Sequence, residues 1–256
     1  MLPKGARQDK AIAAYILAKQ AGINLFIINC CDDLPKTNII IFPGCCGGAF
    51  VNKEDYDKLF ERVEQGASLY VSAFNAQFCE FEKKFGLRSL GMAKKQKQHT
   101  AHFPFGNIEY FNEKEILLEA NGAEVLAANE EGNPVFTKHR LGKGFVYLLN
   151  FGLEQIAAER YNAYDESFGL YKVYQLIEAV EKAADDYLIR INDPCIGVTE
   201  SACQDGYIVT AVNYSNKTVA LNYSVKKGYV VEIIYGNSSN LRGCDATIFK
   251  VSKGLG

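Results

Sequence analysis

Two short runs of apolar residues, separated by one amphipathic helix, constrain the fold of the first part of the chain most strongly. Ile39 to Phe42 and Leu69 to Val71 contain no charged position, as expected for strands that are covered on both faces. Between them, Asn52 can cap a helix that Gly66 can end. The apolar positions of this helix share one face: Tyr56, Leu59, Phe60 and Val63. This order of strand, helix and strand predicts a doubly wound α/β sheet with parallel strands.

The segment before these runs predicts one more helix and one more strand. A helix is expected over residues 9–21, with Gly22 as its left-handed cap. Its expected buried face consists of Ile12, Tyr15, Ile16 and Lys19. The apolar run Leu25 to Ile28 then predicts a strand.

Further along the chain, a weak pattern gives way to a regular one. Residues 85–117 are interrupted by glycine and proline and predict a long, aromatic-rich irregular connection. Tight turns then separate predicted strands over residues 124–127, 135–140 and 145–150. A helix over residues 167–184 is expected to close this domain.

After Pro194 the apolar period changes from that of helices to that of strands. Strands are predicted over residues 207–214, 218–224, 229–235 and 246–251. Short strands with glycine, serine and asparagine turns are typical of a small antiparallel β-sandwich. With 256 residues, two domains are expected: an α/β domain over 1–187 and a β-sandwich over 188–256.

Composition narrows the class of protein. A content of 48% hydrophobic and 23% charged residues is that of an ordinary globular protein, and the sequence has no apolar run of membrane-spanning length. The net charge of −2 gives no reason to expect nucleic acid or an anionic membrane as a partner. The start of the sequence does not read as a signal segment, so its eight cysteines are expected to be thiols and the location cytoplasmic.

No motif predicts a metal or a cofactor. The vicinal pairs Cys30-Cys31 and Cys45-Cys46 lack the spacing that lets two sulfurs hold one zinc ion. His99 and His102 fall three apart in a segment predicted to be irregular, so we interpret them as ordinary loop residues. Neither glycine-rich turn has the pattern of a phosphate-binding loop.

Three segments carry a resemblance to a known family. Ile39 to Gly44, Val63 to Val71 and the hairpin Asn133 to Tyr147 look like the accessory region of clan A glycoside hydrolases, most of all the β-galactosidases of glycoside hydrolase family 42, and also related β-mannanases. In that family a catalytic barrel is followed by a trimerisation domain of the flavodoxin-like, class I glutamine-amidotransferase-like type and then by a small β-sandwich. The resemblance implies the same two-domain order here.

The resemblance also implies what this chain does not do. The turn that carries the reactive cysteine of an amidotransferase reads Ala73-Phe74-Asn75-Ala76, and the family's catalytic barrel is not in this sequence. An amidotransferase-like domain begins with a strand that becomes central in its sheet, but only Met1 to Gln8 precede the first predicted helix. Either these residues supply a short substitute or the strand belongs to a longer chain, and we expect the second. The expected function is a non-catalytic structural and oligomerisation region that partners a glycoside hydrolase barrel and forms a homo-oligomer.

Two other functions remain open. A cysteine-dependent amidotransferase or hydrolase would use Cys45 or Cys46 as nucleophile, with His99, His102 or His139 as base. A carbohydrate-binding module would act through the terminal sandwich.

An aromatic group is the strongest candidate for a substrate or interface site. Its members are Phe103, Phe105, Tyr110 and Phe111. Aromatic faces stack on sugar rings and are enriched at protein interfaces, but they also fill cores. We expect part of this group to face a barrel or a neighbouring subunit.

Overall fold

The computed structural model describes residues 8–25, 27–28, 32, 34–46, 52–74, 76, 78–94, 97–165, 167–180 and 187–254. Packing divides the chain into two units. Unit 1 comprises residues 1–15 and 26–179, and unit 2 comprises residues 16–25 and 180–256. The expected domain boundary at 187/188 stays a prediction.

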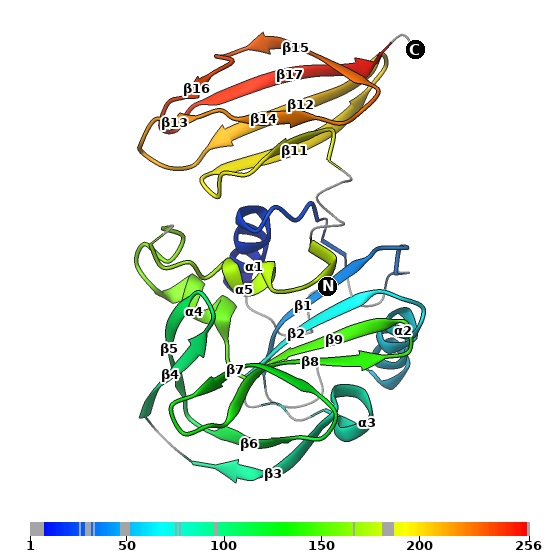
Figure 1. Ribbon diagram of the computed structural model, residues 1–256, viewed down its shortest axis with the longest axis vertical. Helices are drawn as coiled ribbons and strands as arrows, with labels where there is room; N and C mark the ends of the chain where they lie inside the picture. Colours follow the sequence, from blue (N-terminus) through cyan, green and yellow to red (C-terminus); the bar gives the residue numbers. More distant parts are fainter. Residues whose placement is uncertain are drawn as a thin grey trace. The chain divides into compact units, whose positions relative to one another are not determined.

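One curled sheet of seven strands forms the centre of unit 1 (Figure 1). Its spatial order is β1 (Ile39–Cys46), β2 (Ser68–Phe74), β9 (Gly144–Leu149), β8 (Pro134–Leu141), β7 (Glu124–Asn129), β4 (Lys97–Phe103) and β5 (Gly106–Asn112). The first three strands are parallel to one another, and the other neighbours are antiparallel. A separate antiparallel pair joins β3 (Leu87–Ala93) to β6 (Glu115–Ala120). The sheet is therefore mixed.

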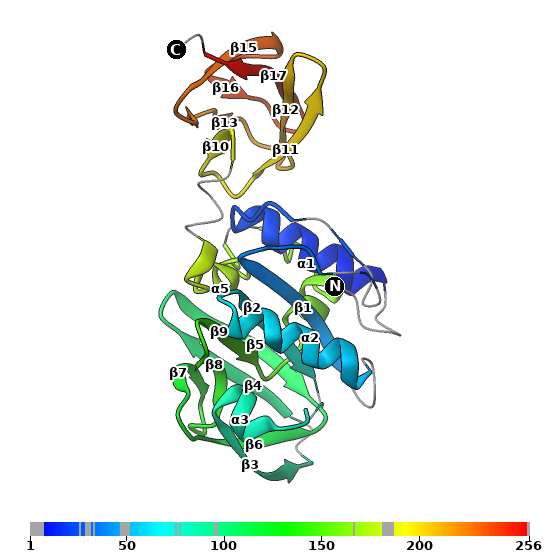
Figure 2. The ribbon, with the colours of Figure 1, turned by 90° about the vertical axis from the view of Figure 1, so that its right-hand side faces the viewer.

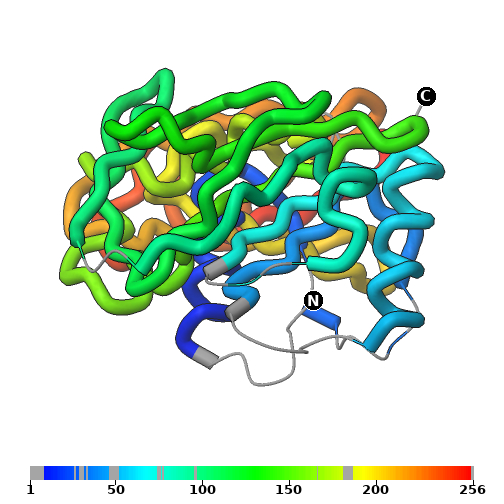
Figure 3. Tube along the Cα trace, turned by 90° about the horizontal axis from the view of Figure 1, so that it is seen from below, coloured from blue at the N-terminus to red at the C-terminus, as the bar shows by residue number. Residues whose placement is uncertain are grey.

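The helices are short, and one of them covers the parallel strands. They are α1 (Gln8–Gln20), α2 (Lys53–Glu64), α3 (Phe81–Phe85), α4 (Leu153–Glu159) and α5 (Lys172–Gln175). Leu59, Phe60 and Val63 of α2 share a buried core with residues of β1, β2 and β9. Figure 2 shows α2 lying along these strands, and Figure 3 shows the same helix from below as a light-blue coil.

The first two helices are confirmed, but one predicted face is wrong. Asn52 caps α2 by accepting a hydrogen bond from the Asp55 backbone N–H, at 2.8 Å. Gly22 follows α1 with φ +79°, as its capping role requires. However, Ile12 is exposed, and the buried positions of α1 include Ala11, Ala14, Leu17 and Ala18. Small alanines, which carry a weak hydropathic signal, form the packed face.

Two predicted segments in unit 1 are wrong. Leu25, Ile27 and Ile28 form no strand, because a four-residue apolar run does not by itself select strand over other buried structure. Residues 85–117 are not irregular: β3, β4, β5 and the start of β6 lie there. The inward positions of these strands include His99, Asn112 and Glu115, so polar residues conceal the alternation from a hydropathic pattern.

Over the described part of residues 167–184, the predicted continuous helix is broken into tight turns, the four-residue α5 and helical residues at 179–180. Successive hydrogen bonds span three residues, from the Lys172 N–H to the Gly169 carbonyl through the Ile177 N–H to the Tyr174 carbonyl. The predicted apolar residues are nevertheless buried: Leu170, Val173, Tyr174, Ile177 and Val180.

Unit 2 is built from antiparallel strands. Four of them form one sheet in the order β11 (Ile196–Cys203), β12 (Gly206–Asn213), β17 (Ala246–Lys253) and β15 (Tyr229–Tyr235). Two further pairs join β10 (Ile189–Ile191) to β14 (Tyr223–Val225) and β13 (Val219–Ala220) to β16 (Asn240–Leu241). The predicted strand 218–224 is thus two short strands, and β11 was not predicted.

A buried asparagine joins the connections of unit 2. The Asn213 side-chain amide donates hydrogen bonds to the backbone carbonyls of Lys217, Leu241 and Arg242, at 2.7, 3.1 and 3.0 Å. Its side-chain oxygen accepts from the Ser215 backbone N–H at 2.9 Å. One side chain therefore satisfies carbonyl groups on two separate loops.

The chain has a mixed α/β fold. No helix among the residues described is long and apolar enough to cross a membrane.

The turn that joins β8 to β9 permits a close approach of two backbone segments. A Cβ atom at Gly144 would lie 2.0 Å from the Ala67 carbonyl oxygen and 2.4 Å from that of Val63. Backbone atoms cannot move aside as a flexible side chain can. Only glycine therefore fits at position 144, where β9 begins beside the segment that leads into β2.

We expect Gly144→Ala to lower the free energy of unfolding by about 3 kcal/mol, because the added methyl group overlaps two backbone oxygens. Gly132→Ala is the matched control: its φ is +82°, but a Cβ there meets nothing within 4 Å, so strain of about 1 to 2 kcal/mol is expected. Urea unfolding of both variants measures the difference. Equal losses would contradict the close approach at Gly144.

Candidate functional site

The carboxyl ends of β1 and β2 are the first place to look for chemistry, since ligands of α/β sheets bind at that edge. There the Gly44 backbone N–H donates a hydrogen bond to the Ser72 hydroxyl, at 2.7 Å. The Ser72 hydroxyl in turn donates to Glu154 Oε2, at 2.5 Å. This chain of bonds joins β1, β2 and α4.

Two tyrosines complete the surroundings of the Glu154 carboxyl. The hydroxyls of Tyr70 and Tyr174 donate to Glu154 Oε1, at 3.0 and 2.9 Å. Tyr70 and Ser72 are two apart on β2 and so point to the same face of the sheet, toward the first turn of α4. All four side chains are fully buried.

Burial raises the pKa of Glu154, even though the three hydroxyl donors favour its ionised form. Burial and the neighbouring Glu154 also raise the pKa of Tyr70 and Tyr174. Because none of these side chains reaches solvent, the network serves to join secondary-structure elements and does not present a reactive group to a substrate.

The reactive-thiol hypothesis gains no support from the sheet register. Cys45 is buried on β1 opposite Ala73, and its thiol points to the Phe42 carbonyl at 3.8 Å. The strand register aligns His139 of β8 with Ile40 of β1, three strands away, which is about 14 Å across the sheet. Cys45 lies about 16 Å farther along β1 from Ile40. His99 and His102 lie on β4, still farther along the strand order. In the strand order, other strands therefore separate all three histidines from the strand of Cys45.

Several other predicted positions fall outside the described residues. These are Cys30, Cys31, Asn75 and the side chains of Phe74 and Cys46.

The four aromatic candidates separate into core and surface. Phe103 and Tyr110 are buried; Phe103 contacts Phe136, and Tyr110 stacks on Phe151 with ring centres 4.4 Å apart. Phe105 is half-buried and stacks on Phe103. Phe111 alone of the four is exposed, at 53%, on β5. Phe111 is therefore the member of the group that is free to meet a partner.

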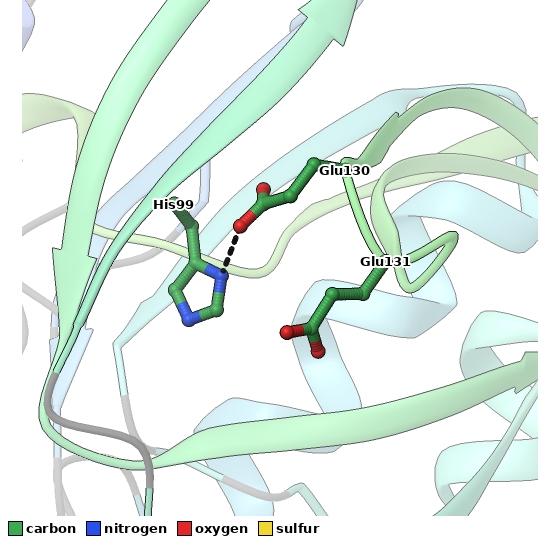
Figure 4. Close-up of side chains that lie close together, drawn as sticks. All are labelled: His99, Glu130 and Glu131. Carbon is green, nitrogen blue, oxygen red and sulfur yellow. Dashed lines mark hydrogen bonds and ion pairs between the residues drawn. The ribbon is translucent and has the colours of Figure 1, made fainter.

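A cluster that the sequence did not predict lies at the β7–β8 turn. The β4–β7 register pairs Ala101 with Asn129, which brings His99 beside the turn that begins at Glu130. Figure 4 shows His99, Glu130 and Glu131 pointing toward one another. Their potential ligand atoms all lie within 4.8 Å of each other. An imidazole nitrogen and two carboxylates form a donor set suited to a divalent metal ion.

Local hydrogen bonds hold this turn in place. Asn129 Oδ1 accepts from the backbone N–H groups of Glu131 and Asn133, at 3.0 and 2.9 Å, and Gly132 takes φ +82°. Partial burial raises the pKa of Glu130, but the hydrogen bond from the Thr100 backbone N–H and the close contact with the His99 ring lower it further, to about 2. The Glu130 carboxylate is thus ionised and fixed.

The interpretation of His99 and His102 as loop residues is wrong, since both lie on β4; His99 is fully buried and His102 is exposed. The spacing of one histidine and two glutamates 31 and 32 positions away gives no recognisable motif. Only the pairing of β4 with β7 brings them together.

Comparisons with known proteins show likeness of fold and not of sequence. No protein-family model matches the chain, and no curated protein matches it. Among solved structures, a catalytic mutant of Gan42B, a GH42 β-galactosidase from G. stearothermophilus, matches 96% of the chain with a TM-score of 0.68 and 14% identity. A β-galactosidase from Bacillus circulans sp. alkalophilus matches 94%, with a TM-score of 0.67 and 15% identity. An α-L-fucosidase from Paenibacillus thiaminolyticus matches 98%, with a TM-score of 0.64 and 10% identity.

These likenesses establish a shared fold. The chain spans 36% of the Gan42B chain, 37% of the B. circulans enzyme and 46% of the fucosidase. It therefore corresponds to a minor part of each glycoside hydrolase.

The buried carboxyl gives a prediction about pH. Because folding raises the pKa of Glu154, its contribution to stability is fully present below the ordinary value of 4.5 and is lost as pH rises through the folded pKa. Between these two pH values the loss is about 1.4 kcal/mol per pH unit. Glu154→Gln cannot ionise, so the stability difference between wild type and this variant should shrink or reverse as pH rises above 4.5.

Urea unfolding at a series of pH values measures this difference. Glu113→Gln, at an exposed position, is the control and should follow wild type. Parallel profiles for wild type and Glu154→Gln would contradict the raised pKa.

Proposed function

We propose that this chain is a non-catalytic structural and oligomerisation region of a β-galactosidase-like glycoside hydrolase, whose catalytic barrel lies outside this sequence. In this proposal unit 1 corresponds to an amidotransferase-like α/β domain, and unit 2 to a small β-sandwich.

One observation carries the proposal. The likeness to Gan42B runs through 96% of this chain and therefore through both units in order, yet it occupies 36% of the Gan42B chain. A chance resemblance of one common fold would cover one unit. In this proposal, catalysis takes place in the part of the enzyme that this chain does not cover.

The variety of the similar enzymes supports a role that is not tied to one sugar. A β-galactosidase and an α-L-fucosidase act on different glycosides by their names, and both contain a region of this fold. A region shared by enzymes of different specificity suits scaffolding better than substrate selection. The buried hydroxyl network around Glu154 also suits that role, since it offers no open reactive group.

Self-association is part of the proposal, and β5 is its best surface. β5 ends the strand order of the seven-stranded sheet, so among the described residues one of its edges is unpaired. Such edges are ready to pair with another chain. Phe111 adds an exposed aromatic ring on this strand. The proposed partner is a second copy of the chain, in a cytoplasmic enzyme.

Carbohydrate binding by unit 2 is a second candidate, favoured by two exposed tyrosines. Tyr214 is 68% exposed, and its ring packs against Gly197 of β11. A Cβ atom at Gly197 would lie 2.3 Å from this ring, so the ring needs the glycine. Tyr235, 58% exposed, pairs with Ile248 of β17. Exposed aromatic rings on a sheet can stack on sugar rings.

We expect the recombinant chain to leave nitrophenyl galactosides, fucosides and mannosides intact and to self-associate in sedimentation experiments. An antibody raised against the chain should capture, from the source cells, a protein whose peptides include a glycoside hydrolase barrel, identified by mass spectrometry. Capture of this chain alone, without barrel peptides, would contradict the proposal. Saccharide binding that Tyr214→Ala abolishes would favour the second candidate.

Two phenylalanine variants separate interface from core. Phe111→Ser should weaken self-association with little effect on stability, because its ring is exposed on an edge strand. Phe103→Ser should lower the free energy of unfolding by about 3 to 5 kcal/mol, because its ring is buried among Phe105, Phe136 and Phe151. Sedimentation and urea unfolding provide the two measurements. Unchanged sedimentation of Phe111→Ser would remove β5 from the interface.

A further inference from the structure

The buried ring of His99 lies between two carboxylates. Nδ1 is 3.0 Å from Glu130 Oε1, and Nε2 is 3.7 Å from Glu115 Oε2. A neutral imidazole carries one N–H, so it can donate to only one of these two groups. At the other nitrogen a lone pair would face a carboxylate oxygen. A second proton, on the imidazole or on Glu115, or a metal ion would stabilise that contact.

Glu115 provides an acceptor for an N–H on Nε2 when Nδ1 binds an ion. The side-chain amides of Asn129 and Asn133 both donate to Glu115 Oε1, at 2.7 and 2.8 Å, and fix the carboxyl. Its Oε2 faces His99 Nε2, a buried nitrogen with no hydrogen bond among the described residues. A histidine that binds a metal through one nitrogen commonly directs its other N–H toward a carboxylate. Nδ1 is then the nitrogen whose lone pair faces the β7–β8 turn.

The turn supplies two further donors on that side of the ring. Glu130 and Glu131 follow Asn129 directly, and their side chains are about one-third exposed, which leaves a path from solvent. Ligand atoms around a tetrahedral ion with bonds of about 2.0 to 2.2 Å lie roughly 3.3 Å apart. His99 Nδ1 and Glu130 Oε1 are already 3.0 Å apart. The ligand atoms of all three residues lie within 4.8 Å of one another, so a small inward movement of the Glu131 side chain would bring it to the required spacing.

A lysine lies against both carboxylates. Lys97 Nζ lies 2.5 Å from Glu131 Oε1 and 3.6 Å from Glu130 Oε1. The lysine thus neutralises the carboxylates that a metal ion would bind, and it competes with the ion.

We propose that His99 Nδ1, Glu130 and Glu131 bind one divalent transition-metal ion, with Glu115 orienting the imidazole and water completing the coordination. The ion would join β4 to the β7–β8 turn, and Lys97 would leave the carboxylates when it binds. This site is independent of the proposed function.

Cobalt titration of the full chain tests the site. Cobalt bound by nitrogen and oxygen gives weak visible absorption bands, whereas cobalt bound by any of the eight cysteines gives intense near-ultraviolet thiolate bands. We expect one equivalent of cobalt to give the weak visible bands and zinc to displace it. No visible band at millimolar cobalt, or thiolate bands alone, would overturn the proposal in favour of a protonated histidine.

Matched variants locate the ion. Glu131→Gln and His99→Gln should each weaken cobalt binding at least tenfold, whereas the exposed control Glu113→Gln should not. Circular dichroism checks folding, and the exposed Glu131 keeps the test valid if His99→Gln fails to fold. Lys97→Met should strengthen cobalt binding about two- to fivefold, because the lysine no longer competes with the ion for the two carboxylates and exposed ion pairs are weak. Unchanged affinity in Glu131→Gln, or weaker binding in Lys97→Met, would contradict the assigned ligands.

Discussion

Three hydroxyl groups hold the buried carboxyl of Glu154, and the arrangement of unit 1 depends on them. Ser72 and Tyr70 come from β2, Tyr174 from α5, and the Gly44 backbone N–H extends the network to β1. Removing a carboxyl group from water is costly unless its oxygens are satisfied, so each of these elements is fixed relative to α4. The edge at which an α/β sheet ordinarily binds ligands is occupied here by its own side chains.

Hydropathic pattern predicted the elements whose packed faces are apolar. The strands β1 and β2, the helix α2 and the β7–β8–β9 hairpins lie where expected. The five apolar residues predicted to be buried between Leu170 and Val180 are buried even though the helix there is not continuous. The pattern failed where polar or small residues face inward. His99 and Glu115 hid β4 and β6, and alanines in α1 misdirected the prediction of its buried face. Their burial depends on partners distant in sequence, which a local pattern does not contain.

The candidate sites show the same limit. Aromatic composition drew attention to residues 103–111, but only strand direction shows that Phe103 and Tyr110 face the core and Phe111 faces solvent. The cluster of His99 with Glu130 and Glu131 arises from the pairing of β4 with β7. Both sites lie on the antiparallel strands of the sheet, and Phe136 lies between Phe103 and Tyr70 of the Glu154 network.

The position of β9 has a consequence for the order of folding. β9 pairs with β8, its immediate predecessor, and with β2, from which α3 and β3 to β8 separate it. A growing chain can close the β8–β9 hairpin locally, but β2 has no inner neighbour until nearly all of unit 1 has been synthesised. Pairing between such distant strands is slow, because a long loop must close first. During translation the layer of β1, β2 and α2 therefore stays incomplete until β9 has been synthesised, and the network around Glu154 forms later still, once Tyr174 has followed.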